Sequence, residues 1–359
     1  MMTDGNGLVM AMNKMKALVK NIYVWLMLVG LICIILLSIA AMNRTEDRNE
    51  RTENGEHLFL TFTPSTISQI YRDDWRIRPR KISGELNLPP GEGPFPAVIL
   101  YHGHYHPDDL KPWFKELVPR LLEANIATFV LDSFTGRKIT NTTYFEARLS
   151  RAARLTDVFQ ALNFLASLDE IDENRIGISG YSVGGTTAML GANLRINETS
   201  LAKGRSFAAI LPVYPSCQVR FHNNELTGAP MLLLLAGDDD YSPYAFCEEY
   251  VEEVSAAGFD VKAKIYADTQ HGWINDKVAS DCEDCMTFKD CGLMYIDDNG
   301  LESALDGEVT TLFGWREYIE TIYRDCGKIG VIFRANQEAK QNTLETTLKF
   351  FSETLQQTE

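Results

Sequence analysis

The chain has 359 residues, of which 34 are Lys or Arg and 49 are Asp or Glu, so its formal charge at pH 7 is −15. An acidic surface repels phosphate backbones, which argues against a nucleic-acid partner. Roughly 300 residues follow the first apolar segment, a length that fits one α/β domain with an insertion.

The first predicted element is an apolar segment near the N-terminus. Residues 22–42 carry no charge, and a helix of this length spans about 30 Å, enough for a bilayer core. Tyr23 and Trp25 lie near its first end, where interfacial aromatic residues are common. The preceding positive charges favour a cytoplasmic N-terminus and place the rest of the chain across the membrane; they are Lys14, Lys16 and Lys20.

We therefore expect a cytoplasmic segment over 1–20, a transmembrane anchor over 21–43 and the rest of the chain on the periplasmic or extracellular side. The small residues of Ser38-Ile39-Ala40 leave a cleaved signal peptide open, and the protein would then be secreted. Residues 44–56 are charged and nearly free of large apolar side chains, which predicts a tether before a domain over 57–359.

Strands and helices are expected to alternate along the rest of the chain, which predicts an α/β fold with a mostly parallel, doubly wound sheet. The apolar periodicity predicts helices over 112–123, 144–168 and 185–193 and a last helix that packs through Leu344, Leu348, Phe351 and Leu355. The predicted strands are 81–88, 96–100, 127–131, 175–179, 208–211, 231–235 and 261–265. Residues 275–328 form a longer excursion, expected to fold over the active site as an insertion held by disulfides.

The chemistry is expected to centre on Gly180-Tyr181-Ser182-Val183-Gly184. This pentapeptide lies between a buried strand and a helix of small and apolar residues. Glycines on both sides of a serine allow the sharp turn of a nucleophile elbow, which projects the hydroxyl. Ser182 is therefore the candidate nucleophile.

A serine nucleophile needs a base and a carboxylate that orients it, and after such an elbow the acid precedes the histidine along the chain. Of six histidines, only His222 and His271 follow Ser182. His222 lies in a polar loop with no strand leading into it. His271 follows the predicted strand 261–265, so His271 is the candidate base.

The acid is expected in the loop after the apolar strand 231–235, where three aspartates are adjacent. Asp239 is favoured as the residue that orients His271, Asp240 is a serious alternative, and Asp238 is the least favoured.

Backbone N–H groups of Val183 and of the loop after strand 96–100 are expected to form the oxyanion hole. His104, or the neighbouring Gly103, would supply the second donor. Tyr105 and His106 are expected to line the substrate pocket together with Tyr181. The alternating histidines of His102-Gly103-His104-Tyr105-His106 also resemble a metal cluster, but no cysteine pair or carboxylate stands beside them, and no metal is expected.

These motifs resemble the dienelactone hydrolase family of the α/β-hydrolase superfamily, over roughly 83–355. The similarity includes Val130-Leu131-Asp132-Ser133-Phe134-Thr135-Gly136-Arg137, the lead into the elbow at 171–176 and two cysteine-bearing loops at 213–217 and 240–247. Aligned without gaps on the second loop, the acid position falls on Asp239, whereas counting from Gly237 gives Asp240. The family's founding enzymes have cysteine at the nucleophile position, where this chain has Ser182.

The resemblance implies an α/β-hydrolase fold and a serine hydrolase that cleaves carboxylic esters or lactones through an acyl-enzyme, with no cofactor. Its expected partners are a small ester or lactone substrate and the membrane, through residues 22–42. A peptidase of the prolyl-oligopeptidase type shares the elbow and the order of the triad, but residues 44–80 are too short for its propeller domain. A non-catalytic pseudo-hydrolase that binds a ligand is a further alternative, which the intact Ser182 and His271 disfavour.

Six cysteines follow the apolar segment, and beyond an export signal they are expected to form disulfides. Cys217 and Cys247 lie on loops that leave the same edge of the sheet, after adjacent parallel strands about 4.8 Å apart, so a bridge between them is expected. The remaining cysteines are Cys282, Cys285, Cys291 and Cys326; a zinc site is the alternative for the first three.

Overall fold

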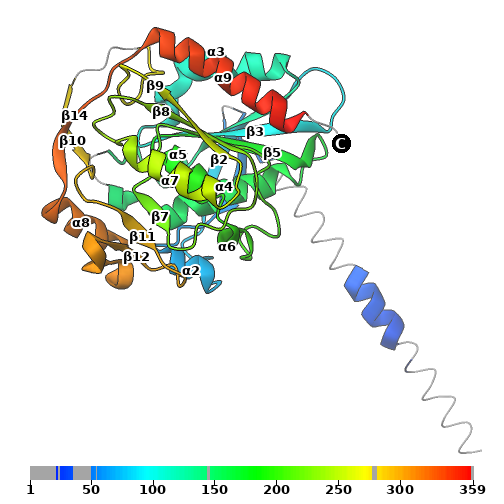
Figure 1. Ribbon diagram of the computed structural model, residues 1–359. Coiled ribbons are helices and arrows are strands. Elements are labelled where there is room, and N and C mark those ends of the chain that lie inside the picture. The colour runs from blue at the N-terminus through cyan, green and yellow to red at the C-terminus, as the bar shows by residue number, and fades with distance from the viewer. Residues whose placement is uncertain are drawn as a thin grey trace, which may run out of the picture. The chain divides into compact units, whose positions relative to one another are not determined.

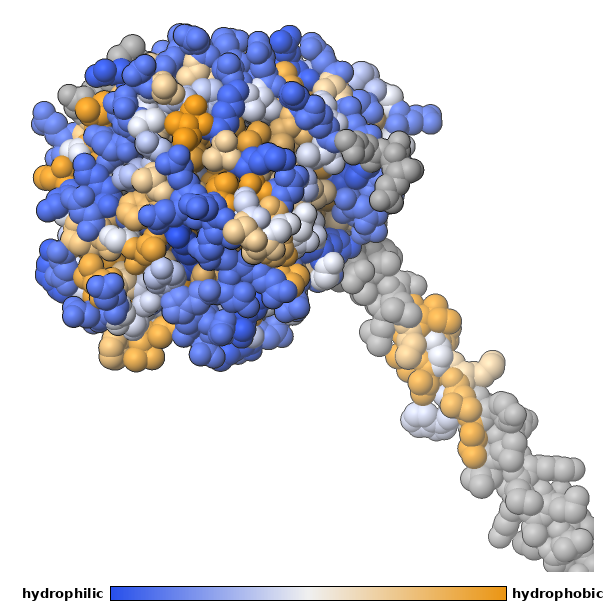
Figure 2. Space-filling model, in the orientation of Figure 1, coloured by the Kyte–Doolittle hydropathy of each residue, from blue (hydrophilic) through white to orange (hydrophobic). Residues whose placement is uncertain are grey.

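The computed structural model describes residues 22, 25–34, 50–53, 55–143, 146–276 and 281–356. The chain divides into two units, residues 1–50 and residues 51–359. In the first unit residues 25–34 are helical, and their apolar side chains are exposed (Figure 2). Among the described residues no helix is both long and apolar enough to cross a membrane. About half of the predicted anchor and about half of the predicted tether fall outside the described residues.

The second unit is built on an eight-stranded sheet with the strand order β1-β2-β4-β3-β5-β6-β8-β9 (Figure 1). The first three strands in this order pair antiparallel and the others pair parallel. This arrangement confirms the predicted mostly parallel α/β sheet. The strands are β1 (His57–Thr61), β2 (Arg80–Asn87), β3 (Phe95–Tyr101), β4 (Ala127–Asp132), β5 (Ile171–Tyr181), β6 (Ile210–Val213), β8 (Met231–Ala236) and β9 (Val261–Tyr266).

Helices cover both faces of this sheet (Figure 1). The alternating side chains of β3 show why both faces are apolar, because Ala97 and Ile99 belong to one core and Val98 and Leu100 to the other. On the second face lie α3 (Lys111–Glu123) and α9 (Gln337–Leu355), and on the first lie α4 (Arg151–Leu165) and α7 (Ala245–Ala256). The other helices are α2 (Ile67–Tyr71), α5 (Val183–Leu190), α6 (Leu194–Asn197) and α8 (Trp315–Asp325).

Helix α4 starts later than the sequence predicts, at Arg151 instead of position 144. Ser150 is extended and its side chain accepts a hydrogen bond from the amide of Ala153, which caps the helix. The expected apolar face is present, since Leu155, Val158 and Phe159 are fully buried.

The long excursion before α9 forms small sheets of its own. In one of them β11 (Met294–Ile296) pairs in parallel with β7 (Val219–Phe221), which links the insertion to the central fold. The other strands are β10 (Asp281–Thr287), β12 (Glu302–Ala304), β13 (Val309–Thr310) and β14 (Lys328–Ile332), and β10 pairs with β14. Several of these short strands, and β1, were not predicted.

Three disulfides hold the fold. The predicted bridge between Cys217 and Cys247 is confirmed, with Cα atoms 4.9 Å apart. The insertion contains the bridges Cys282–Cys285 and Cys291–Cys326. Because each of these cysteines is part of a disulfide, the alternative of a zinc site at Cys282, Cys285 and Cys291 is wrong.

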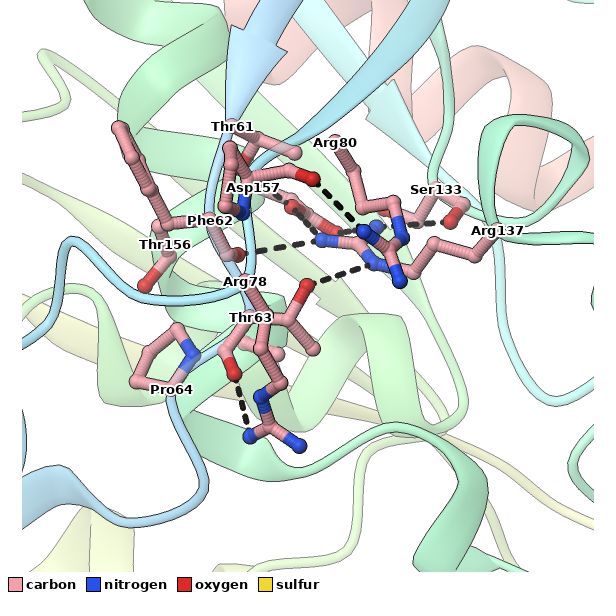
Figure 3. Close-up of polar contacts among 12 residues, drawn as sticks. Thr61, Phe62, Thr63, Pro64, Arg78, Arg80, Ser133, Arg137, Thr156 and Asp157 are labelled. Carbon is pink, nitrogen blue, oxygen red and sulfur yellow. Dashed lines mark hydrogen bonds and ion pairs between the residues drawn. The ribbon is translucent and has the colours of Figure 1, made fainter.

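A buried ion pair fixes the loop that follows β4 (Figure 3). Arg137 donates from two nitrogens to both carboxylate oxygens of Asp157 on α4, at 2.8 and 2.7 Å. The same guanidinium donates to the carbonyls of Ser133 and Phe62, and Thr61 at the end of β1 donates to Asp157. One arginine thus connects α4, the loop after β4 and the segment that follows β1.

Candidate active site

Ser182 occupies a sharp turn between β5 and α5. Its backbone has φ 56° and ψ −123°, a conformation that is rare for a residue with a side chain and is typical of a strained functional turn. The turn depends on close backbone contacts at its glycines. A Cβ at Gly180 would lie 2.1 Å from the carbonyl oxygen of Gly184, and a Cβ at Gly184 would lie 2.4 Å from that of His102.

A continuous chain of hydrogen bonds joins Ser182, His271 and Asp239. His271 Nε2 lies 2.9 Å from Ser182 Oγ, and His271 Nδ1 lies 2.7 Å from Asp239 Oδ2. The second oxygen of Asp239 accepts from the amides of Tyr241 and Ser242 at 2.9 and 2.8 Å. These two bonds hold the carboxylate in one orientation.

The other residues considered for these roles lie elsewhere. Asp240 accepts a hydrogen bond from the amide of Ile332 in β14, at 3.0 Å, and Asp238 is exposed. His222 is exposed too, with its ring against Tyr295. Among the described residues, the carboxylate that contacts the His271 imidazole is that of Asp239.

Two backbone N–H groups are placed beside Ser182. Val183 is the first residue of α5, where helical N–H groups have no partner within the helix. The loop after β3 passes close to the serine, because a Cβ at Gly103 would lie 3.1 Å from Ser182 Cβ. Among the described residues, the amides of Val183 and His104 donate no hydrogen bond to another protein group. They are therefore available to a bound oxygen.

The residues expected to line the pocket are only partly near it. His104 lines a cavity of about 50 Å³ together with Ser182 and Val183. Tyr181 does not: its side chain is buried between the sheet and α3, where its hydroxyl accepts a hydrogen bond from Trp113 at 2.8 Å. That expectation was wrong because side chains alternate along a strand, so the residue before the serine points away from the site.

Tyr105 and His106 lie beside the cavity lining. Tyr105 is 40% exposed, and its hydroxyl lies 3.8 Å from the sulfur of Cys285 in the insertion. The side chain of His106 contacts the loop after β4 instead, with its Nε2 2.9 Å from Thr135 Oγ1.

Several cavity residues come from α4, from η3 (Glu146–Arg148) and from the insertion, and were not predicted. Arg151 is buried, forms an ion pair with Glu302 of β12 and lies over the ring of Trp315. Burial raises the pKa of Glu146, although Arg151 and Arg154 lower it. An arginine at the start of a largely apolar helix was the sequence feature that could have indicated this part of the cavity. The remaining residues of the lining are Thr186, Ser216, Gln218, Val219, Tyr241, Ser242, Thr287, Phe288 and Met294.

Aromatic rings surround the base. The ring centroids of Tyr214 and Tyr241 lie 4.7 and 4.8 Å from that of His271, and the centroid of Phe333 lies at 5.5 Å. His271 is only 2% exposed as a result. Hydrogen bonds and ion pairs in such a site are screened little by solvent.

Two histidines of the loop after β3 are held in the neutral form. Burial lowers the pKa of His102 to about 4, and its ring nitrogens contact the carbonyl of Gly103 and the amide of Ser133. Burial and the nearby charge of Arg154 hold the pKa of His104 well below its usual value.

The model of the dienelactone hydrolase family matches residues 95–291, a stretch that includes Ser182, Asp239 and His271. The chain belongs to the dienelactone hydrolase family. As a member of it, the chain is a hydrolase that acts on ester bonds, and its α/β-hydrolase fold is the expected one.

Other known proteins resemble this chain in sequence or in fold. Protein usf of Aquifex pyrophilus is 24% identical over 206 residues, which cover 55% of this chain and 84% of that protein. A dienelactone hydrolase-like promiscuous phosphotriesterase from metagenomic libraries superposes with a TM-score of 0.48 and 15% identity, over 83% of this chain and 98% of that one. A thermophilic esterase of Thermogutta terrifontis, with bound propionate, gives a TM-score of 0.43 and 14% identity, over 57% and 84% of the two chains.

Proposed function

We propose that this family member is a serine esterase that cleaves short carboxylic esters or lactones through an acyl-enzyme. The observation that carries the proposal is the unbroken chain of hydrogen bonds from Ser182 through His271 to Asp239, at 2.9 and 2.7 Å. An imidazole in contact with a serine hydroxyl is the arrangement that general-base catalysis needs.

In the proposed mechanism, Ser182 Oγ attacks the carbonyl carbon while His271 Nε2 takes the serine proton. The amides of Val183 and His104 donate hydrogen bonds to the oxyanion as charge develops there. His271 then gives its proton to the leaving alcohol, which leaves the acyl group esterified to Ser182. A water molecule deprotonated by His271 attacks this ester, and His271 returns that proton to Ser182 Oγ as its bond to the acyl carbon breaks and the acid is released.

The direct test combines labelling with kinetics. A fluorophosphonate probe is expected to label one peptide, the one that contains Ser182. Ser182→Ala should lose about 10³-fold or more in the hydrolysis of p-nitrophenyl acetate, because the covalent step is gone. Ser167→Ala, just after the end of α4, is the matched control and should retain activity. Activity of Ser182→Ala within tenfold of the wild type would disprove the assignment.

We further propose that residues 22–42 anchor the enzyme in a membrane, with the catalytic domain outside the cytoplasm. Support comes from the uncharged stretch itself, from Lys14, Lys16 and Lys20 before it, and from three disulfides, which persist in oxidising compartments. Carbonate extraction of membranes should leave the full-length protein in the pellet. Recovery of a soluble chain that begins after Ala40 would show a cleaved signal peptide instead.

A further inference from the structure

Thr142 connects the side chains of His104 and Arg154 beside the candidate active site. Its hydroxyl lies 2.8 Å from His104 Nδ1 and 2.8 Å from Arg154 Nη2. Its amide also donates to the carbonyl of His104, at 2.8 Å. Thr142 is fully buried and Arg154 is 1% exposed, so the two partners that hold the half-buried His104 ring are sheltered from water.

The proton positions in this group follow from its chemistry. A guanidinium nitrogen can only donate, so Arg154 donates to the Thr142 oxygen. The single hydroxyl proton of Thr142 is then free to donate to His104 Nδ1. The reverse arrangement, in which Nδ1 donates, would leave a buried hydroxyl proton without an acceptor, which costs about 1–3 kcal/mol. His104 therefore accepts at Nδ1.

A neutral imidazole that accepts at Nδ1 carries its proton on Nε2. The imidazolium form is disfavoured by the same contacts, because its additional proton would lie on Nδ1 and face the hydroxyl. Burial and Arg154 also hold the pKa of His104 well below its usual value, which keeps the ring neutral. Among the described residues, no protein group accepts a hydrogen bond from His104 Nε2.

His104 lines the cavity that Ser182 and Val183 also line. With a volume of about 50 Å³, the cavity has room for only a few non-hydrogen atoms. This small volume favours a short acyl group on the carbonyl carbon over a long one. Polar residues such as Glu146 and Ser242 share the lining, which suits an acyl group with an oxygen acceptor better than a purely alkyl one.

We propose that the His104 side chain is a fixed, neutral hydrogen-bond donor to the acyl group of the substrate. The enzyme consequently prefers short acyl groups that carry an oxygen acceptor over alkyl groups of the same size. Arg154 and Thr142 are positioning residues that set the tautomer of His104. This inference rests on the proposed esterase function and adds the class of acyl group.

The test compares two esters that differ in one atom, p-nitrophenyl methoxyacetate and p-nitrophenyl butyrate. Each kcat/KM is divided by the rate of the same ester with hydroxide, because the ether oxygen also activates the carbonyl. For the wild type, the normalised ratio of methoxyacetate to butyrate should be about three to ten, which corresponds to the contribution of one hydrogen bond. If the wild type cleaves neither ester, the proposed esterase function fails; if it cleaves both with a normalised ratio near one, only the present inference fails.

Matched variants test whether His104 and Thr142 cause the preference for the methoxyacetyl group. His104→Leu removes the donor and should bring the ratio to about one, whereas His104→Gln retains an N–H group and should keep part of the preference. Thr142→Val removes the hydroxyl with little change of shape and should also lower the ratio, and Thr142→Ser should keep it. A uniformly damaged site lowers both rates and leaves the ratio unchanged, so an unchanged ratio in His104→Leu overturns the proposal.

Nitrogen-15 NMR provides a readout that does not depend on turnover. Spectra are recorded for Ser182→Ala and for the Ser182→Ala/His104→Gln double variant. The imidazole signal that is present in the first spectrum and missing from the second belongs to His104. We expect it to show a protonated Nε2 and an unprotonated Nδ1 from pH 6 to pH 8. A proton on Nδ1, or a ring that becomes charged in this range, would overturn the proposal.

Discussion

The carboxylate of Asp239 lies 2.7 Å from Nδ1 of His271, and both side chains are almost completely buried. Each oxygen of the carboxylate has a separate task. One contacts the imidazole and the other accepts two backbone amides, so the aspartate cannot rotate without losing bonds. The neighbouring Asp240 is bonded to β14 instead. This difference makes the two adjacent aspartates experimentally separable.

We expect Asp239→Asn to lower kcat by about 10⁴-fold, because the amide no longer fixes the imidazole tautomer. Asp240→Asn should stay within about tenfold of the wild type, since an amide oxygen can still accept from Ile332. Steady-state kinetics on p-nitrophenyl acetate measures both. The reverse order of effects would make Asp240 the acid.

Stability should fall as the pH is lowered from 7 to 5 because of His102. Its pKa in the folded protein is about 4, below its usual value of 6.5, so the unfolded chain binds more protons in this range. The free energy of unfolding should therefore drop by about 2 kcal/mol by pH 5 from this residue alone. Urea unfolding at several pH values measures the slope, which should be smaller in His102→Asn. Equal slopes in the two proteins would contradict the prediction.

The bridge between Cys217 and Cys247 closes a loop of 30 residues. Replacing both cysteines by alanine should lower the free energy of unfolding by about 3–4 kcal/mol, as expected from the added freedom of the unfolded chain. Denaturant titration of oxidised protein checks this, with Cys33→Ser at the free, exposed cysteine as the control. A loss below about 1 kcal/mol would show that the bridge adds little beyond the packing around it.

The buried pair of Arg137 and Asp157 should behave differently from an exposed pair. Asp157→Asn leaves the Arg137 charge buried without its counter-ion and is expected to cost about 3–5 kcal/mol of stability. Glu320→Gln breaks the exposed pair with Arg316 and should cost less than about 1 kcal/mol. Denaturant titrations of the two variants give the comparison, and similar losses would show that burial does not distinguish them.

Much of the fold could be predicted from the sequence because local patterns determine it. The apolar run of β8 favours a buried strand, and the glycines around Ser182 favour a sharp turn. The choice between Asp239 and Asp240 could not be made, because it depends on which carboxylate the following turn points toward His271. The inner wall of the cavity was missed for a similar reason: Arg151 is stabilised there by Glu302, which is distant along the chain.

The bridge between Cys291 and Cys326 has a consequence for a protein exposed to proteases. A single cut at any peptide bond from Gly292 to Asp325 would leave the two pieces covalently joined. Leu312 and Phe313 are large apolar residues in this range that are 70% and 78% accessible, so a protease can reach the chain there. A nicked molecule would thus migrate as one chain on a gel without reductant and as two chains with it, and its α9 would still be attached to the sheet that it covers.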